Sequence, residues 1–367
     1  MDKIKLKSSV LFYEDLGQAD SIVTIRFNSE LIKFEDPIGD IRCLLLLLFK
    51  GENEREIIKL FKSKYPASDI NSYLDTLKYL GLVESLTTDT YPLTTYDTKR
   101  WSRNLEFFNS LIPFGESKYH IQGILKKSRV CLIGCGGLGS HILYELAALG
   151  IGSVTIIDFD KIDISNFNRQ ILYREKDIGN DKVITAQKNI LEFNSKIKIK
   201  AINKKISSTK DISELITGHD IVVCVADKPR DKIIGWLNES CCTENIPFIN
   251  GGLDLRQALF YSVIPGYSGC VECWSDFLPD KSIQKRTILE DFRIHKDYCA
   301  PSPAMSPLIS VATGVMVSEL IKILTKTQPP VLNNKLKAFT FDTLELKTVE
   351  TWKRNLKCKC CSNKMRD

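Results

Sequence analysis

Residues 129–140 read RVCLIGCGGLGS, a short apolar run followed by a turn rich in glycine. The apolar run is typical of a buried strand. Gly134, Gly136 and Gly139 have the G-x-G-x-x-G spacing that brings phosphate groups to a helix N-terminus, and Gly137 adds a fourth glycine to the turn. The pattern predicts a nucleotide site in which free backbone N–H groups and the helix dipole attract anions.

Asp158 is the second feature of this predicted site. It ends the next apolar strand, where a carboxylate accepts a hydrogen bond from a ribose hydroxyl. Taken alone, these residues fit NAD, FAD or a mononucleotide. They also fit a glycine turn that serves only core packing.

The surrounding chain alternates strands and helices, which predicts an α/β fold. A strand–loop–helix–strand unit is expected over 129–160. Further strands are expected at 197–202, 220–225 and 258–264, and helices at 181–194, 228–240 and 310–325. The expected architecture is a Rossmann-like, largely parallel sheet with helices on both faces.

The pattern of apolar and polar residues over 1–90 differs from that of the rest of the chain and predicts a small winged-helix (α+β) domain. Ser21–Phe27 alternates like a half-buried strand, and Asp40 is placed to cap the apolar helix that follows. Two more helices are expected up to Gly81. We expect a linker and dimer arm at 91–118 and the nucleotide-binding domain at 119–367.

Charge and hydropathy narrow the possible partners. Residues 1–90 hold 12 Lys and Arg against 15 Asp and Glu, although the whole chain carries a net charge of +6. DNA binding needs a cationic surface, so we expect no nucleic-acid partner and infer that Ser21–Phe27 extends its sheet with a bound peptide. The longest apolar run, Cys43–Phe49, is far shorter than the roughly 20 residues of a membrane span. The chain start has no secretory signal, so a cytoplasmic location without membrane contact is expected.

Four of the twelve cysteines form two C-x-x-C pairs, Cys270 with Cys273 and Cys358 with Cys361. Four thiolates in this grouping favour tetrahedral Zn²⁺ in a closed structural site that would tie the C-terminal tail to the domain. Cys360, inside the second pair, leaves the choice of ligands open. Other cysteines lie in apolar runs and are expected to be buried packing groups, as at Cys131, Cys135 and Cys224.

Further motifs decide between the nucleotides. Asp158-Phe-Asp160, Asn166-Phe-Asn-Arg169-Gln, Gly179-Asn-Asp-Lys182 and Val225-Ala-Asp227 follow the glycine turn in that order. Together they resemble the ubiquitin-activating superfamily of adenylyltransferases, over roughly residues 97–350. The resemblance implies ATP and excludes NAD.

The resemblance also implies roles. Arg169 and Lys182 would bind the phosphates, and Asp227 would hold Mg²⁺ beside the leaving group. The sugar and its surroundings would be held by Asp158, Asp160 and Asn166. Arg103, in Arg100-Trp-Ser-Arg103-Asn, matches the arginine that one subunit offers to its neighbour's phosphates, which implies a homodimer.

The N-terminal ninety residues favour one branch of this superfamily. Small winged-helix units of this kind resemble leader-recognition elements, and the Ala226-Asp-Lys-Pro and Gly269-Cys-Val-Glu-Cys segments resemble the microcin C and pantocin maturase type. The function expected is activation or nucleotidylation of a ribosomal precursor peptide in antibiotic biosynthesis. Activation of a sulfur carrier that ends in Gly-Gly, and an idle peptide-presenting protein, remain as alternatives. Cys299 has no context that assigns it a thioester role.

Overall fold

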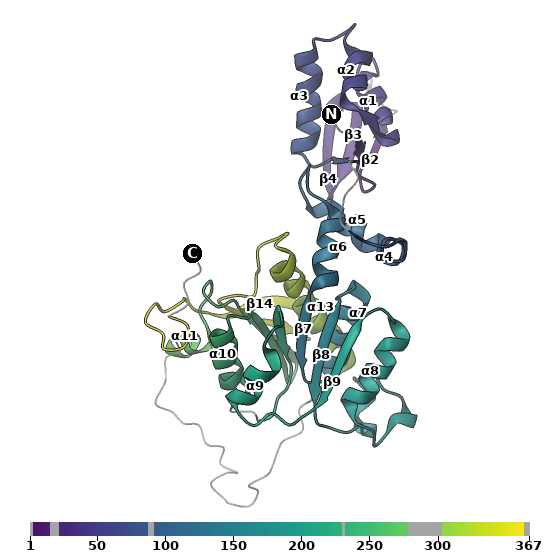
Figure 1. The fold of residues 1–367 in the computed structure, drawn as a ribbon. Helices are drawn as coiled ribbons and strands as arrows, with labels where there is room; N and C mark the ends of the chain where they lie inside the picture. Colours follow the sequence, from purple (N-terminus) through teal and green to yellow (C-terminus); the bar gives the residue numbers. More distant parts are fainter. Residues whose placement is uncertain (1–2, 15–21, 87–91, 230–231, 278–302, 363–367) are drawn as a thin grey trace, which may run out of the picture. The chain divides into compact units, whose positions relative to one another are not determined.

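The structure, a computed structural model, describes residues 3–14, 22–86, 92–229, 232–277 and 303–362 (Figure 1). The chain forms two compact units, which are treated one at a time below. The first unit is Met1–Ile124 and the second is Leu125–Asp367. Cys299 and most of the predicted loop at 277–307 lie outside the described residues.

The first unit contains two small antiparallel sheets and three helices ahead of residue 87. One sheet has the order β5-β1-β6 and the other β2-β3-β4. The strands are β1 (Lys3–Leu6), β2 (Leu11–Glu14), β3 (Ile22–Phe27), β4 (Glu30–Glu35), β5 (Glu52–Asn53) and β6 (Val83–Ser85). The helices are α1 (Asp40–Lys50), α2 (Glu54–Phe61) and α3 (Ala67–Tyr79), and one apolar core joins all of them.

Two local expectations for this unit are wrong. The strand predicted at Ser21–Phe27 exists as β3, but β2 and β4 pair with its two edges, so its backbone is not available to a peptide. Asp40 does not cap α1 but opens its first turn and binds Lys64 and Tyr65. The backbone N–H groups at the helix start donate instead to the buried carboxylate of Asp36.

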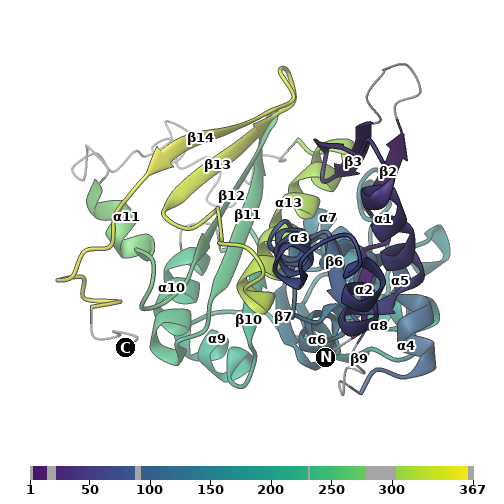
Figure 2. The ribbon, with the colours of Figure 1, turned by 90° about the horizontal axis from the view of Figure 1, so that it is seen from above.

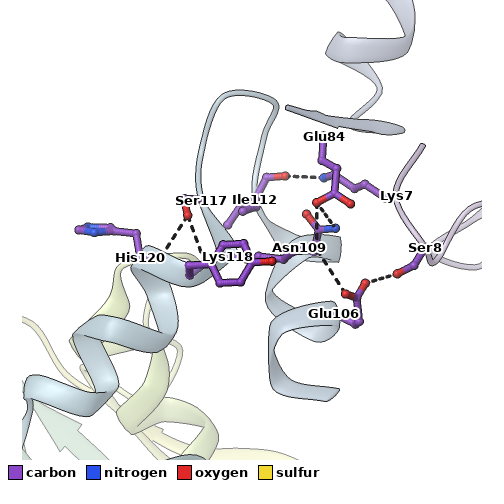
Figure 3. Close-up of polar contacts among 10 residues, drawn as sticks. Lys7, Ser8, Glu84, Glu106, Asn109, Ile112, Ser117, Lys118 and His120 are labelled. Carbon is purple, nitrogen blue, oxygen red and sulfur yellow. Dashed lines mark hydrogen bonds and ion pairs between the residues drawn. The ribbon is translucent and has the colours of Figure 1, made fainter. Parts of the chain in front are cut away.

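Three further helices belong to the first unit: α4 (Thr95–Arg100), α5 (Ser102–Leu111) and α6 (Lys118–Lys127), the last of which runs across the boundary. Figure 3 shows the polar contacts that join α5, α6 and the loop between them to β6 and to Lys7 and Ser8, which follow β1. Lys118 Nζ lies 3.0 Å from Glu84 of β6 and 3.2 Å from Glu106 of α5. Asn109 also donates to Glu84, over 3.0 Å, and Ser8 contacts Glu106.

Lys7 adds a buried contact to this network. Its side chain is 2% exposed, and its ammonium donates to the carbonyl of Ile112 over 2.7 Å. Phe114, beyond α5, packs against the apolar core of the unit, and the Lys78 ammonium lies over its ring. The first compact unit ends at Ile124. The domain division expected from the sequence, at 1–90, 91–118 and 119–367, stays a prediction.

The second unit is built on an eight-stranded sheet with the order β14-β13-β12-β11-β10-β7-β8-β9. Its first five strands along the chain are parallel and the last three antiparallel: β7 (Arg129–Ile133), β8 (Ser153–Asp158), β9 (Lys198–Asn203), β10 (Ile221–Cys224), β11 (Phe248–Asp254), β12 (Gln257–Val263), β13 (Lys335–Thr340) and β14 (Glu345–Thr351). The expected α/β class is confirmed.

Helices cover both faces of this sheet (Figure 2). α9 (Thr209–Ile216) and α10 (Ile233–Glu244) lie on one face, and α7 (Gly137–Leu149) and α13 (Ser306–Thr325) on the other. α8 (Lys182–Phe193) packs beside α7, and the short α11 (Val271–Phe277) packs on α10. Among the described residues α13 alone has the length and apolarity of a membrane span, and half of its apolar window is buried inside the protein.

Candidate active site

The site lies where the direction of winding of the sheet reverses. β7 pairs in parallel with β8 on one side and with β10 on the other, so Ile133 lies beside both Ile157 and Cys224. The carboxyl ends of these three strands therefore meet at one edge. This is the switch point at which open parallel sheets bind ligands.

The glycine turn at this edge has no room for a side chain at Gly134 or Gly139. Gly134 has φ +99°, and a Cβ there would lie 2.9 Å from the Ala226 backbone nitrogen. A Cβ on Gly139 would lie 1.9 Å from the Gly134 carbonyl oxygen. α7 begins at Gly137 without a side-chain hydrogen bond to cap it. Its first N–H groups therefore face the cavity as anion donors.

Asp158 connects the end of β8 to this turn. One carboxylate oxygen accepts the Cys135 N–H over 2.7 Å, and the other accepts the Asp160 N–H over 2.8 Å. Each oxygen keeps a second lone pair for a ligand hydroxyl. Asp158 thus fixes the turn and lines the cavity, as a ribose acceptor must.

Lys182 and Asp160 meet although 21 residues separate them in the sequence. The intervening chain folds back on itself, because Ile162 and Asn180 pair through their backbones and Lys182 N donates to the Asp160 carbonyl. The Lys182 ammonium lies 3.0 Å from the Asp160 carboxylate, and its side chain is 7% exposed. The charge is therefore held at the cavity wall and is not free to sample solvent.

Arg169 and Asn166 come from the same folded-back segment. Arg169 donates to the Ser165 carbonyl and to Asn168, and its own carbonyl lies 3.2 Å from His141 Nε2 on α7. Burial lowers the pKa of His141, so the ring is neutral near pH 7. Asn166 is buried and lines the same cavity.

Two adjoining cavities share this edge. The smaller, of about 100 Å³, is lined in part by Asp158, Phe159 and Lys204. The larger, of about 470 Å³, is lined in part by Asn166 and Arg169. Both contain Gly136, Asp160, Lys182, Val225, Ala226, Asp227 and Lys228. The structure therefore brings together the predicted residues of the second unit, with Gly134 and Gly139 shaping the turn.

Several lining residues were given no role from the sequence. Lys204 follows β9, and Asn250 lies in β11, whose position the sequence analysis did not predict. Gln170 is 3% exposed, and its Oε1 has no hydrogen-bond partner among the described residues. Lys204 lies just beyond the carboxyl end of a parallel strand, Asn250 pairs with Cys224 at the carboxyl end of β10, and Gln170 follows Arg169.

The four paired cysteines converge in a buried cluster. Cys270 Sγ lies 3.9 Å from Cys273 Sγ and 3.6 Å from Cys358 Sγ, and Cys273 Sγ lies 3.5 Å from Cys361 Sγ. Tetrahedral zinc with bonds of about 2.3 Å separates its sulfurs by about 3.8 Å. The donor set fits zinc in number, chemistry and spacing.

Three cysteines and one arginine remain among the residues predicted from the sequence. Cys131, Cys135 and Cys224 are buried, and burial raises the pKa of the Cys224 thiol to about 12, which suits packing groups. Arg103 lies on α5 with its side chain exposed. It belongs to the first compact unit, whereas the residues that line the two cavities belong to the second.

Comparison with known proteins identifies the family. The sequence model of the ThiF family matches residues 108–360, well over half of the chain. The chain belongs to the ThiF family. The activity expected from the sequence, ATP-dependent adenylyl transfer, agrees with the names of curated relatives.

Curated relatives in the ThiF family carry adenylyltransferase names. The ThiS adenylyltransferase of Bacillus subtilis strain 168 is 30% identical over 240 residues, which are 65% of this chain and 64% of that protein. The molybdopterin-synthase adenylyltransferase of Escherichia coli K12 is 27% identical over 65% of this chain and 89% of that protein. The chain thus spans slightly less than two thirds of the first of these relatives.

Solved structures of ThiF-like proteins match nearly the whole chain. E. coli MccB with selenomethionyl MccA is 25% identical, with a TM-score of 0.80 over 98% of this chain and 100% of MccB. MccB is a microcin C7 biosynthetic enzyme. PaaA has a TM-score of 0.72 at 20% identity, over 93% of this chain and 99% of PaaA. The predicted resemblance to the microcin C maturation enzyme is confirmed.

Proposed function

We propose that this protein is an ATP-dependent adenylyltransferase that acts on a carboxylate or carboxamide of a ribosomally made precursor peptide in antibiotic biosynthesis. The observation that carries the proposal is the cavity in which Lys182 and Asp227 lie beside the glycine turn of a ThiF-family chain. Adenylation asks a protein mainly to neutralise and align phosphates. The cavity supplies two cations, free backbone N–H groups and a carboxylate for that task.

The two cavities suggest where the reactants bind. The nucleoside would occupy the smaller one, between Asp158, Phe159 and Lys204, and the phosphates would lie at the residues that both cavities share. The substrate group would enter through the larger one, past Asn250 and Gly251. In this arrangement a substrate oxygen attacks the α-phosphorus, and pyrophosphate leaves between Lys182 and Arg169.

Asp227 would hold Mg²⁺, which neutralises phosphate oxygens when it is bound. Its carboxylate follows β10, lines both cavities, and has no hydrogen bond or ion pair to another described residue. Hard metal ions prefer carboxylate oxygens as ligands. The Asp227 carboxylate can take this role, because it lies near the cations expected to bind phosphate but forms no ion pair with a described one.

The first unit would capture the precursor. A cavity of about 260 Å³ lies between β4, α1 and α3, with an apolar lining that includes Phe34, Leu44 and Tyr73. β4 is an edge of its sheet among the described strands. A peptide that pairs with this edge would place an apolar side chain in the cavity. This site replaces the excluded pairing with β3.

Three features of assembly belong to the same proposal. Cys270, Cys273, Cys358 and Cys361 would hold Zn²⁺ and fix the tail. Arg103 would reach the phosphates of a second copy in a homodimer. A cytoplasmic location without membrane or nucleic-acid partners is proposed for the reaction.

The length of the structural match supports a peptide substrate. E. coli MccB, solved with its MccA precursor peptide, matches the first unit as well as the second. The names of the Bacillus and E. coli relatives support the alternative substrate, a sulfur carrier that ends in Gly-Gly. Those matches cover only 65% of this chain, and the carrier gives no use for the apolar cavity of the first unit.

ATP–pyrophosphate exchange distinguishes the substrates. The full chain would be assayed with synthetic peptides translated from any short open reading frame beside its gene and, separately, with a β-grasp carrier that ends in Gly-Gly. We expect exchange that depends on the peptide. Exchange with the carrier alone would establish the sulfur-carrier function, and exchange with neither would remove adenylation from this chain. Mass spectrometry of the peptide would then tell whether the nucleotide stays on the product.

A further inference from the structure

Two more cysteines adjoin the four-sulfur cluster. Cys242 comes from α10, Cys270 from the start of α11, and Cys360 from the C-terminal tail. Their Sγ atoms all lie within 4.8 Å of one another. Cys270 also belongs to the paired set with Cys273, Cys358 and Cys361, so the two groups of thiols share one sulfur.

Cys242 and Cys360 pack in or against the apolar core of the second unit, and the four-sulfur site uses neither of them. Cys242 is fully buried, and Cys360 is partly buried beside it. A C-x-x-C pair supplies its two ligands without Cys360, and the four-sulfur site is complete without Cys242. Two thiols therefore remain next to a sulfur that a metal would already hold as a thiolate.

Asn238 supports a ligand role for Cys360. The amide is 2% exposed, and its Nδ2 donates to Cys360 Sγ over 3.1 Å. Its Oδ1 accepts the Val271 N–H over 2.9 Å, which fixes the direction of the donor. A buried N–H directed at sulfur stabilises a thiolate and orients it, as groups behind metal ligands do.

We propose that Cys242, Cys270 and Cys360 bind a second thiophilic metal ion, with the Cys270 sulfur bridging the two sites. Each thiol that coordinates gives up its proton, so the ion replaces protons and no redox step occurs. Three thiolates in a buried pocket select soft ions of the zinc and monovalent copper class and exclude magnesium. This site is independent of the proposed adenylation.

Stoichiometry tests the second site. The full chain as purified would be analysed for metal and titrated with Cd²⁺, with charge-transfer absorption and ¹¹³Cd NMR as readouts. We expect two ions per chain and two cadmium resonances that couple through the bridging sulfur. Cys360→Ser and Cys242→Ala should each bind one ion, and Cys43→Ser, at an exposed cysteine of the first unit, should bind two.

Three outcomes would overturn the proposal. One is saturation of the wild-type chain at a single ion, which would make Cys360 and Cys242 bystanders or exchangeable ligands of one zinc. Another is two ions in both variants. The third is two uncoupled resonances, which would exclude a shared sulfur. The number of ions bound by the wild-type chain tests the proposal even if Cys242→Ala does not fold.

Discussion

The Lys182 ammonium lies 3.0 Å from the Asp160 carboxylate, at the wall shared by the two cavities. Without nucleotide this carboxylate compensates the buried charge. Under the proposed function, an arriving phosphate would find the cation already in place, so its reorganisation cost on binding would be small. The pair therefore explains how a long lysine side chain acts as a fixed part of the site.

Lys182→Ala should lower ATP–pyrophosphate exchange by about 10²- to 10³-fold, because one charged donor to the phosphates is lost. Circular dichroism should show an intact fold. Lys188→Ala, at an exposed position of the same helix, is the matched control and should retain exchange. Equal activity of the two variants would remove Lys182 from the mechanism.

Asp227→Asn should raise the Mg²⁺ concentration needed for half-maximal exchange by about tenfold or more, because a neutral amide is a weaker ligand for a hard cation. The measurement is exchange rate against Mg²⁺ at constant ATP. Asp254→Asn, at the end of β11 and outside both cavities, should leave the curve unchanged. An unchanged midpoint in Asp227→Asn would assign the metal to other residues.

Tyr73→Ser should weaken precursor binding by about tenfold, because an aromatic surface of the cavity in the first unit is lost. ATP affinity should not change. Tyr79→Ser is the control, since Tyr79 lies on the same helix, is 89% exposed and is not part of that cavity. Fluorescence anisotropy of a labelled precursor provides the measurement. Equal loss in both variants would place the peptide elsewhere.

The first unit should become more stable as the pH rises from about 8 towards 10.5. Burial lowers the pKa of Lys7 from 10.5 to about 8, against an opposing contribution from Glu84. In that window the unfolded chain holds more protons at Lys7 than the folded chain, so stability rises with pH. Below pH 8 both states are protonated and the slope disappears.

Calorimetry of the full chain from pH 7 to 10 measures this slope. Lys7→Met should remove it, and Lys3→Met, at an exposed position of β1 four residues earlier, should not. A slope that persists in Lys7→Met would have another origin.

Zinc removal should release the C-terminal tail. Trp274, next to Cys273, stacks on Trp352 with ring centroids 5.0 Å apart, so the pair reports on this region. A strong chelator should shift tryptophan emission and lower the unfolding temperature, because folding energy is coupled to metal binding. Restored emission on adding Zn²⁺ completes the test. A chelator without effect on either signal would contradict a structural metal.

The sequence predicted the parts of the site that chemistry constrains locally. The glycine turn and Asp158 could be found because nucleotide binding favours these residue types at the ends of parallel strands. Lys182 and Asp227 were found through the resemblance of the ordered motifs to adenylyltransferases. The contact between Lys182 and Asp160 could not be found, since it depends on how the intervening chain folds back. Lys204 could have been found by noting which residues follow parallel strands.

The fold was least predictable where strands are exposed on both faces. β14 is exposed along almost its whole length, so its side chains show no alternation of apolar and polar residues. β2 and β4 were missed for lack of long apolar runs, and this left β3 with an apparent free edge. The error about the peptide partner of β3 followed directly from the unseen neighbours.

The buried contacts of Lys7, Glu84 and Lys118 determine where this chain can be joined to another in a chimera. A chimera that exchanges residues 1–86 alone would lose the contacts of Glu84 with Lys118 and of Lys7 with Ile112. The charged side chains at the junction would then have no partners. A graft that ends after Ile124 carries the network whole. Under the proposed function, a change of precursor specificity by domain exchange would require a junction at that later point.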